Sequence, residues 1–124
     1  MDIEQMEIFP AVTDDEKLAV RTLLERYPRM KMMCLALERR TDRTGKEETV
    51  RRIYKKLVED IDTAVNLIVD DEVRRVLEER YFRSQKYKTT IFRFSSMSER
   101  TVDRRIDEGV ETITECLKLC GHNF

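Results

Sequence analysis

The sequence predicts an all-α protein, with an N-terminal helical bundle or hairpin followed by a C-terminal helix-turn-helix. Three observations predict this class. Apolar residues recur mostly at steps of three and four, and no stretch of useful length alternates as a strand does. Only 3 of the 124 residues are glycine and 2 are proline. Charged residues make up 40% of the chain, which suits long helices with one solvated face, and the hydrophobic 40% is enough for a modest core.

A first helix is predicted to begin at Thr13, after a loose lead-in over residues 1–12. Glu16 follows Thr13 by three positions, which is the spacing of a capping box, where each side chain satisfies the other's free backbone N–H. Pro28 is predicted to end this helix, because proline disfavours the helical conformation of the residue before it.

Two more helices are predicted to complete an N-terminal region over residues 1–69. The second runs from about 30 to 40 and ends at the polar segment TDRTG (41–45), and the third runs from about 46 to 69. The third helix carries an apolar stripe made of Val50, Ile53, Tyr54, Leu57, Ile61, Val65 and Ile68. This stripe is predicted either to pack on the first two helices or to form the seam of a homodimer.

The second predicted helix is rich in methionine. Met30, Met32 and Met33, with Leu35 and Leu37, form an apolar patch between basic residues. The patch is either part of the core or a flexible surface that receives a partner helix, and the residues alone leave both interpretations open.

A fourth helix is predicted to open the C-terminal region, residues 70–124. Asp70 and Asp71 suit its start, because carboxylates are favoured at the positive end of the helix dipole. Its apolar face is formed by Val73, Val76, Leu77, Tyr81 and Phe82.

The last two predicted helices are separated by the turn FSSMS. The fifth covers about residues 87–94, and Ser98 caps a final helix over 99–119 that Gly121 stops. Gly109 lies inside this final helix, at a cost of roughly 1 kcal/mol relative to alanine.

Charge is unevenly distributed along a chain whose net charge is −1. Residues 1–28 carry 3 basic and 7 acidic side chains, and residues 106–124 carry 1 basic and 4 acidic ones. Between them, residues 83–105 carry 7 basic and 2 acidic side chains. A basic block between two acidic ones is typical of a local binding surface for a polyanion.

The end of the basic block has the pattern of a helix-turn-helix. Val102, Ile106 and Val110 form one inward stripe that can pack on Ile91, Phe94 and Met97. This leaves Ser98, Glu99, Arg100, Thr101, Arg104 and Arg105 outward or at the tip. Arginine can contact phosphates or pair with guanine edges, while hydroxyls and free N–H groups at a helix start can bind phosphates. The sequence therefore predicts a DNA-binding helix.

The same residues resemble a known family. MSERTVDRRIDEGVETI (97–113) resembles the recognition helix of sigma-factor region-four domains, and VRRVLEERYF (73–82) resembles the helix that precedes it there. With a helical N-terminal half, the chain is most similar to ArpU-type phage late-transcription regulators, which phages and prophages of Gram-positive bacteria encode. The resemblance covers about residues 70–121.

This resemblance implies a sequence-specific transcription regulator of phage or prophage late genes, which reads the major groove with the helix beginning at Ser98. It places DNA contacts on Ser98, Glu99, Arg100, Thr101, Arg104 and Arg105, and phosphate contacts on Lys86, Lys88 and Arg93. The implied partners are double-stranded DNA, RNA polymerase and a second copy of the chain. Phe92 stands where the consensus favours a small residue, and this predicts a wider separation of the two helices or a different crossing.

Two other functions are compatible with the sequence. A small terminase-like DNA-packaging subunit also uses a helix-turn-helix, but in most such subunits that element is N-terminal, which favours the regulator. A helical adaptor without DNA affinity is the third interpretation.

Other classes lack support in the sequence. A glycine-rich phosphate loop, a nucleophile elbow and an HExxH motif are all missing, so the chain is not expected to be an enzyme. Cys116, Cys120 and His122 lack a local fourth ligand, so no metal or other cofactor is predicted, and both cysteines are expected on a buried helix face. Three cysteines, no signal peptide and no long apolar run predict a cytoplasmic protein without a membrane span. The resemblance to phage regulators implies that this cytoplasm is that of a bacterial host cell.

Overall fold

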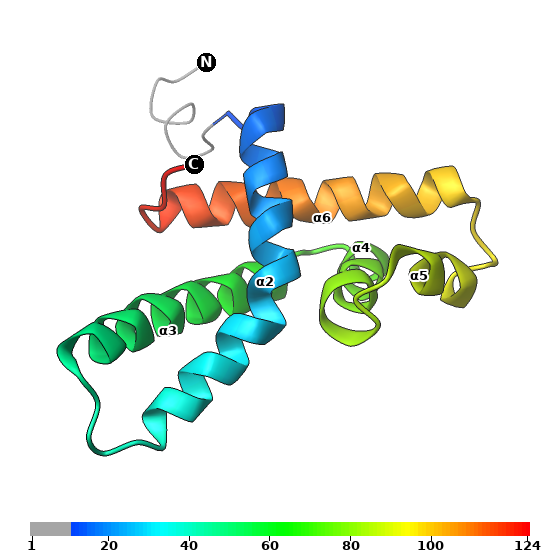
Figure 1. The fold of residues 1–124 in the computed structure, drawn as a ribbon. Helices are drawn as coiled ribbons and strands as arrows, with labels where there is room; N and C mark the ends of the chain where they lie inside the picture. Colours follow the sequence, from blue (N-terminus) through cyan, green and yellow to red (C-terminus); the bar gives the residue numbers. More distant parts are fainter. Residues whose placement is uncertain (1–10) are drawn as a thin grey trace.

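The computed structural model describes residues 11–124, and every regular element in that range is helical (Figure 1). The elements are the α-helices α2 (Asp14–Glu38), α3 (Gly45–Asn66) and α4 (Asp71–Glu78), the π-helical turn η1 (Glu79–Arg83), and the α-helices α5 (Tyr87–Arg93) and α6 (Glu99–Leu119). The predicted all-α class is confirmed for this part of the chain. Within the same residues, no helix has both the length and the apolar composition that a membrane crossing requires.

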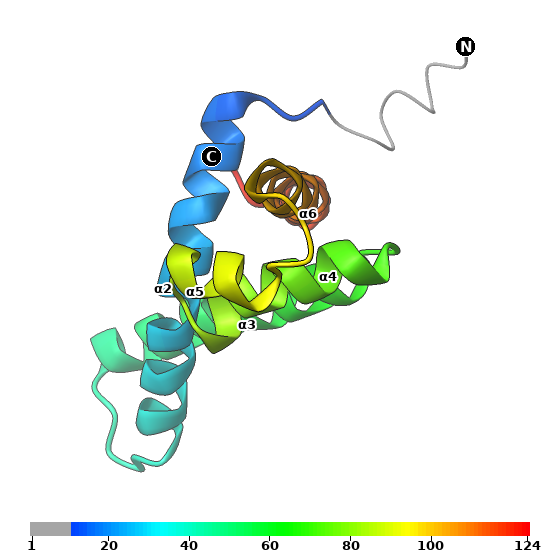
Figure 2. The same ribbon diagram turned by 90° about the vertical axis from the view of Figure 1, so that its right-hand side faces the viewer.

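Helix α6 lies across the molecule and packs against α2, α3 and α4 (Figure 1, Figure 2). All four helices contribute to one hydrophobic core, whose largest fully buried side chains are Leu24, Ile61, Leu77, Ile113 and Leu117. Burying a side chain of this size contributes roughly 1.5–3 kcal/mol. The predicted regions 1–69 and 70–124 therefore share one core, and their separation into functional units stays a prediction.

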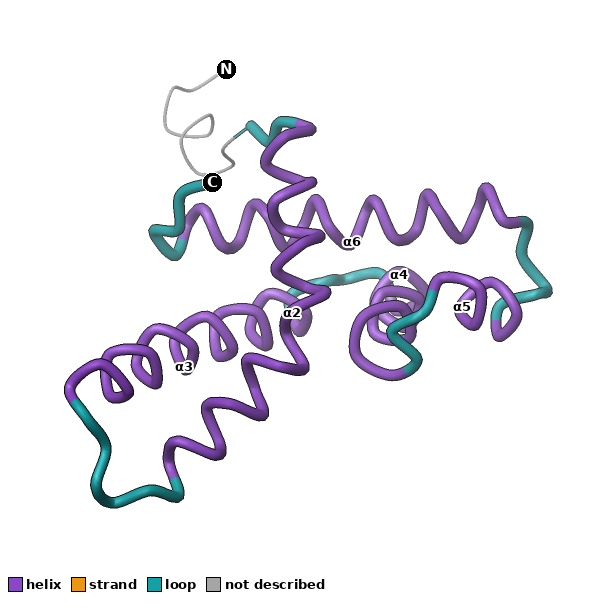
Figure 3. The backbone as a smooth tube through the Cα atoms, viewed as in Figure 1, coloured by secondary structure: helices purple, strands orange, loops and turns teal. Residues whose placement is uncertain are grey.

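Helix α2 continues through Pro28, so the prediction that Pro28 ends the first helix was wrong. The predicted capping box is present: the Glu16 backbone N–H donates to Thr13 Oγ1 at 3.1 Å, and the Thr13 N–H donates to Glu16 Oε1 at 2.9 Å. Proline removes one helical hydrogen bond, but Tyr27 and Met30 on either side of it are both buried, and their packing keeps the two halves helical. Figure 1 and Figure 3 show that α2 changes direction along its length, as proline-containing helices do.

Helix α3 directs most of its apolar stripe into the chain's own core. Ile61, Val65 and Ile68 are buried, and Tyr54 and Leu57 pack partly buried against the same cluster. The alternative in which this stripe packs on the chain's own helices is therefore the one observed. The stripe is not left over as a seam for a homodimer.

The connection between α2 and α3 is held by ion pairs around Glu48. TDRTG forms the predicted break, and α3 begins at Gly45. Arg51 Nη2 lies 2.7 Å from Glu48 Oε1, and Arg43 Nε lies 2.7 Å from Glu48 Oε2. These hydrogen bonds, that from Arg51 first and that from Arg43 second, lower the pKa of Glu48 from 4.5 to about 2.

An NMR pH titration of the Glu48 side-chain carboxyl carbon is expected to give a pKa of about 2. Because the folded-state pKa is depressed, the contribution of Glu48 to stability is complete above its unfolded pKa, near 4.5, and is lost as the pH falls toward 2. In Arg43→Gln/Arg51→Gln the pKa of Glu48 should rise toward its ordinary value. An unchanged low pKa in that variant would contradict the assignment of these two arginines as the cause.

Helix α4 begins as predicted, but it ends in a π-helical turn that the sequence did not predict. The Asp70 carboxylate accepts hydrogen bonds from two backbone N–H groups of the first turn, at 2.9 and 3.1 Å. In η1 the helix widens, and the Ser84 N–H donates to the Glu79 carbonyl oxygen at 3.1 Å. Gln85 follows with a φ of 58°, the one positive φ outside glycine among the described residues. This sharp exit directs the chain into α5.

Candidate nucleic-acid interface

The end of the molecule that carries the predicted DNA contacts consists of α5, the turn after it and the first turns of α6 (Figure 1). Ser98 caps α6 as predicted, because its Oγ accepts a hydrogen bond from the Thr101 backbone N–H at 3.1 Å. The two hydroxyl oxygens, Ser98 Oγ and Thr101 Oγ1, lie 2.9 Å apart. Both predicted contact residues therefore help to fix the start of the helix.

The inward stripe of α6 is the one that the spacing predicted. Val102, Ile106 and Val110 are buried, while Phe94 and Met97 in the turn pack partly buried against the core. Helix α6 lies in the plane of Figure 1 and is seen along its axis in Figure 2. Helix α4 is seen along its axis in Figure 1 and from the side in Figure 2, so the two helices cross at a steep angle. The opposite side of α6 is left to polar residues.

Phe92 does not separate the helices, so the prediction of a wider separation at this residue was wrong. Its side chain is 78% exposed and points away from the core. The fully buried residue of α5 is Thr90, whose hydroxyl donates to the Lys86 carbonyl oxygen at 3.0 Å. The small residue at the packed position of α5 is therefore Thr90, two places before Phe92, and its hydroxyl is hydrogen-bonded within the helix.

Arg105 differs from the neighbouring Arg104 because it is held within the fold. Its Nε lies 2.7 Å from Glu72 Oε1 on α4, and its Nη1 lies 3.3 Å from Glu108 Oε2. The side chain is only 24% exposed. Arg104 is more exposed, and its nearest carboxylate, on Glu108, is 3.9 Å away. Arg105 therefore joins α4 to α6, and Arg104 remains accessible to a ligand.

Arg100, Lys86 and Lys88 are the freest cations of this surface. All three are exposed, and none has a carboxylate within ion-pairing distance among residues 11–124. These residues can therefore exchange water for phosphate oxygens without first breaking an internal ion pair.

Arg93 is tied to a buried carboxylate. Its Nε lies 2.8 Å from Glu79 Oε1, and the side chain is still 62% exposed. The N–H does not point at that oxygen, so within the described residues Oε1 accepts no hydrogen bond although Glu79 is buried. The positive charge of the Arg93 guanidinium therefore lies beside the Glu79 carboxylate, while the other side of the guanidinium is exposed to solvent.

Glu99 and Asp103 link α6 to α5 through Tyr87. The Tyr87 hydroxyl can donate to Asp103 Oδ1, 2.5 Å away, or to Glu99 Oε1, 3.1 Å away. The hydrogen bond to Asp103, aided by the second carboxylate, raises the pKa of Tyr87 above its ordinary value. The predicted contact Glu99 is therefore part of a neutral-phenol bridge that fixes the angle between the two helices.

Two further basic features were missed by the sequence analysis. Arg75, Arg83 and Arg93 line a cleft of about 240 Å³ together with Glu78 and Glu79, which leaves one positive charge in excess. The segment 26–56 carries 11 basic and 4 acidic side chains, a larger excess than that of residues 83–105. A charge count over longer windows would have found the second feature, but not the first, which requires the positions of the helices.

The three side chains Cys116, Cys120 and His122 differ in burial and in their partners. Cys116 is buried as predicted, but Cys120 is exposed, so the prediction that both lie on the buried face was wrong for Cys120. His122 Nε2 lies 2.7 Å from Asp60 Oδ2 on α3. In residues 11–124 no three His, Cys, Asp or Glu side chains are placed to hold a metal ion.

The chain matches no family model, no curated protein and no solved structure. The likeness to sigma region-four and ArpU-type proteins therefore rests on the residues quoted above. The exposed groups of the α5–α6 end and their chemistry are what bears on function.

Proposed function

We propose that this chain binds double-stranded DNA through the start of α6 and acts as a sequence-specific transcription regulator. The observation that carries the proposal is the set of exposed cations without an internal partner in the described residues, Arg100 on α6 with Lys86 and Lys88 at α5. A protein with a net charge of −1 would not attract DNA as a whole. Its affinity has to come from such a local surface.

The shape of the α5–α6 end fits a duplex. The N-terminal turns of α6 continue past α4 toward the turn, with α5 beside them (Figure 1). The major groove is about 12 Å wide and admits one α-helix. With α6 in the groove, Arg100 and Arg104 would reach base edges or phosphates, and Lys86 and Lys88 on the flank would reach the backbone.

The finer assignment comes from the resemblance of residues 70–121 to ArpU-type regulators. It supports control of phage or prophage late genes and a contact with RNA polymerase. A single helix-turn-helix gains specificity when two copies read two half-sites, so homodimerisation on DNA belongs to the same proposal.

Fluorescence polarisation with labelled duplex fragments from the surrounding genome tests the proposal. With three to five phosphate contacts, the slope of log K against log salt should be about −2.7 to −4.5. Affinity should therefore fall by roughly 40-fold to 500-fold between about 50 and about 200 mM salt. One fragment should also be preferred over the others. Equal and salt-insensitive binding to all fragments, or no binding at all, would overturn the proposal.

A further inference from the structure

A second surface with its own chemistry lies on α2 and α3. Arg26, Arg29, Met30 and Met33 of α2 line a groove of about 350 Å³ together with Tyr54 of α3. None of these residues belongs to the α5–α6 end. The groove is therefore a feature separate from the proposed DNA contacts.

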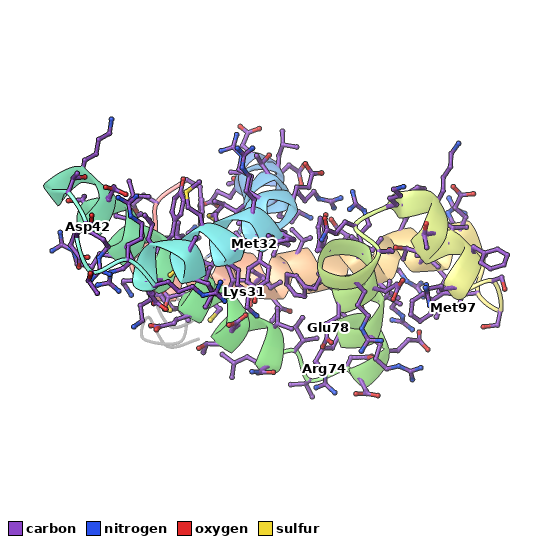
Figure 4. All side chains as sticks on the ribbon, turned by 60° about the horizontal axis from the view of Figure 1, so that its bottom comes forward. Lys31, Met32, Asp42, Arg74, Glu78 and Met97 are labelled. Atoms are coloured by element: carbon purple, nitrogen blue, oxygen red, sulfur yellow. The ribbon has the colours of Figure 1, made fainter. Side chains whose placement is uncertain are left out.

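The structure resolves the two interpretations of the methionine patch. Met30 is 6% exposed and belongs to the core, whereas Met32 is 72% exposed and Met33 and Leu35 are exposed too. Figure 4 labels Met32 and its neighbour Lys31 on α2. Met32 follows Arg29 by three positions, so the two lie side by side on the helix surface. Exposed methionine is typical of surfaces that adapt to a partner.

The α2–α3 hairpin carries an excess of positive charge, and its glutamates are paired with basic residues other than Arg26 and Arg29. Glu25, which precedes Arg26 in the chain, lies 3.7 Å from Arg80. Glu48 is shared by Arg43 and Arg51, and Glu47 is paired with Arg40. Glu38 is in turn 3.8 Å from Arg51 and 3.9 Å from Lys55. These ion pairs involve three of the four acidic side chains in residues 26–56, a segment that carries 11 basic ones.

Arg26 and Arg29 remain at the rim of the groove. Both are exposed, and in the part of the chain that the structure describes neither has a carboxylate within ion-pairing distance. The groove thus combines apolar walls with two uncompensated positive charges.

We propose that this surface, formed by Arg26, Arg29, Met32, Met33 and Tyr54, binds an acidic amphipathic helix of a partner protein. The apolar side of such a helix would cover the methionines and the groove, and its carboxylates would meet the two arginines. A nucleic-acid backbone would satisfy the arginines but leave the exposed methionines in water. The combination of charge and apolar area therefore favours a protein over a polynucleotide.

The test uses the full chain and a fluorescein-labelled synthetic helix with leucine on one side and glutamate on the other. The control peptide has lysine in place of every glutamate. The glutamate peptide should bind at least tenfold more tightly than the lysine peptide. Equal binding of the two peptides, or no binding of the glutamate peptide, would overturn the proposal.

Variants then locate the binding site. Arg26→Glu/Arg29→Glu and Met32→Ser/Met33→Ser should each weaken binding of the glutamate peptide at least tenfold, with unchanged circular dichroism and melting. Lys86→Glu/Lys88→Glu is the charge-matched control on the other surface, because it also replaces two exposed cations by carboxylates, and it should leave peptide binding unchanged. If Arg26→Glu/Arg29→Glu instead abolishes duplex binding and spares the peptide, the surface is a nucleic-acid contact and the proposal is wrong.

Discussion

Gly109→Ala is expected to destabilise the native protein but to stabilise a Leu77→Ala variant. Gly109 lies where α6 crosses α4, and a Cβ atom added there would be 2.5 Å from Leu77 Cδ1 and 3.3 Å from Leu77 Cβ. Overpacking of this kind costs about 1–3 kcal/mol. Leu77 is fully buried and cannot turn its Cδ1 into solvent, so we expect a cost above the roughly 1 kcal/mol that alanine gains over glycine inside a helix. In the native background we therefore expect a net loss.

Leu77→Ala alone should lower the free energy of unfolding by about 2–5 kcal/mol, because Leu77 is fully buried and its removal leaves a cavity. With Cδ1 and Cγ absent, only the 3.3 Å contact with the Cβ of residue 77 remains, and a shift of a few tenths of an ångström relieves it. Gly109→Ala should then raise stability by up to about 1 kcal/mol. Urea denaturation followed by circular dichroism gives the free energies of unfolding of the native protein, the two single variants and the double variant, which together form a double-mutant cycle.

Gly45→Ala is the control for helix propensity without contact. Gly45 is the first residue of α3, and a Cβ there would meet nothing within 4 Å. It should change stability only slightly in either background. If Gly109→Ala has the same sign with and without Leu77, the close approach of α4 and α6 at this glycine is not what selects the residue.

The helix starts could be predicted because their signals are local. Thr13, Asp70 and Ser98 each accept a hydrogen bond from a backbone N–H two or three residues ahead, so the sequence contains both partners. The same holds for the stop at Gly121, whose φ of 96° is readily adopted only by glycine. Such signals depend on no other part of the fold.

Pro28 shows how tertiary packing overrides a local signal. Its effect on the helix is local, but the burial of Tyr27 and Met30 depends on the chain that packs against α2, which the sequence around Pro28 does not reveal. The π-helical turn at Glu79 also gives no local signal, and its Glu79 and Tyr81 are both buried by other parts of the chain.

The sequence was sufficient to place the predicted contact residues at α5 and the start of α6, but it did not reveal whether each side chain is free or paired. Arg105 is 33 residues from Glu72, so no pattern near Arg105 reveals their ion pair. Met30 and Met32 differ by two positions, a rotation of about 200° on a helix, which places one in the core and the other in water. Phe92 and Thr90 differ in the same way. Small errors in the position of a helix face therefore change which residues are available for binding.

Lys88→Ala/Arg100→Ala is expected to weaken duplex binding more than tenfold while the protein stays folded. Neither side chain has an internal ion pair among residues 11–124, so their removal should not disturb packing. If both contact phosphates, the slope of log K against log salt should become shallower by about 1.8. Fluorescence polarisation at several salt concentrations measures both quantities, and thermal melting checks the fold.

Arg39→Ala/Arg52→Ala is the matched control, because it removes the same charge from two exposed arginines on α2–α3 outside the methionine groove. It should leave both affinity and salt slope nearly unchanged. An equal loss in the control would mean that DNA binding follows the overall charge or the α2–α3 hairpin, and that the start of α6 is not the contact.

The single variants separate positioning from sequence reading. A phosphate contact weakens binding to every fragment alike, whereas a base contact costs about 1–3 kcal/mol and relaxes the preference for one fragment. We expect Lys88→Ala to lower the affinity for every DNA fragment by a similar factor, because Lys88 lies in α5, beside the helix that is proposed to enter the groove. Arg100→Ala should in addition reduce the difference in affinity between the preferred fragment and the others. Arg100 lies in the first turn of α6, the part of a recognition helix that meets base edges.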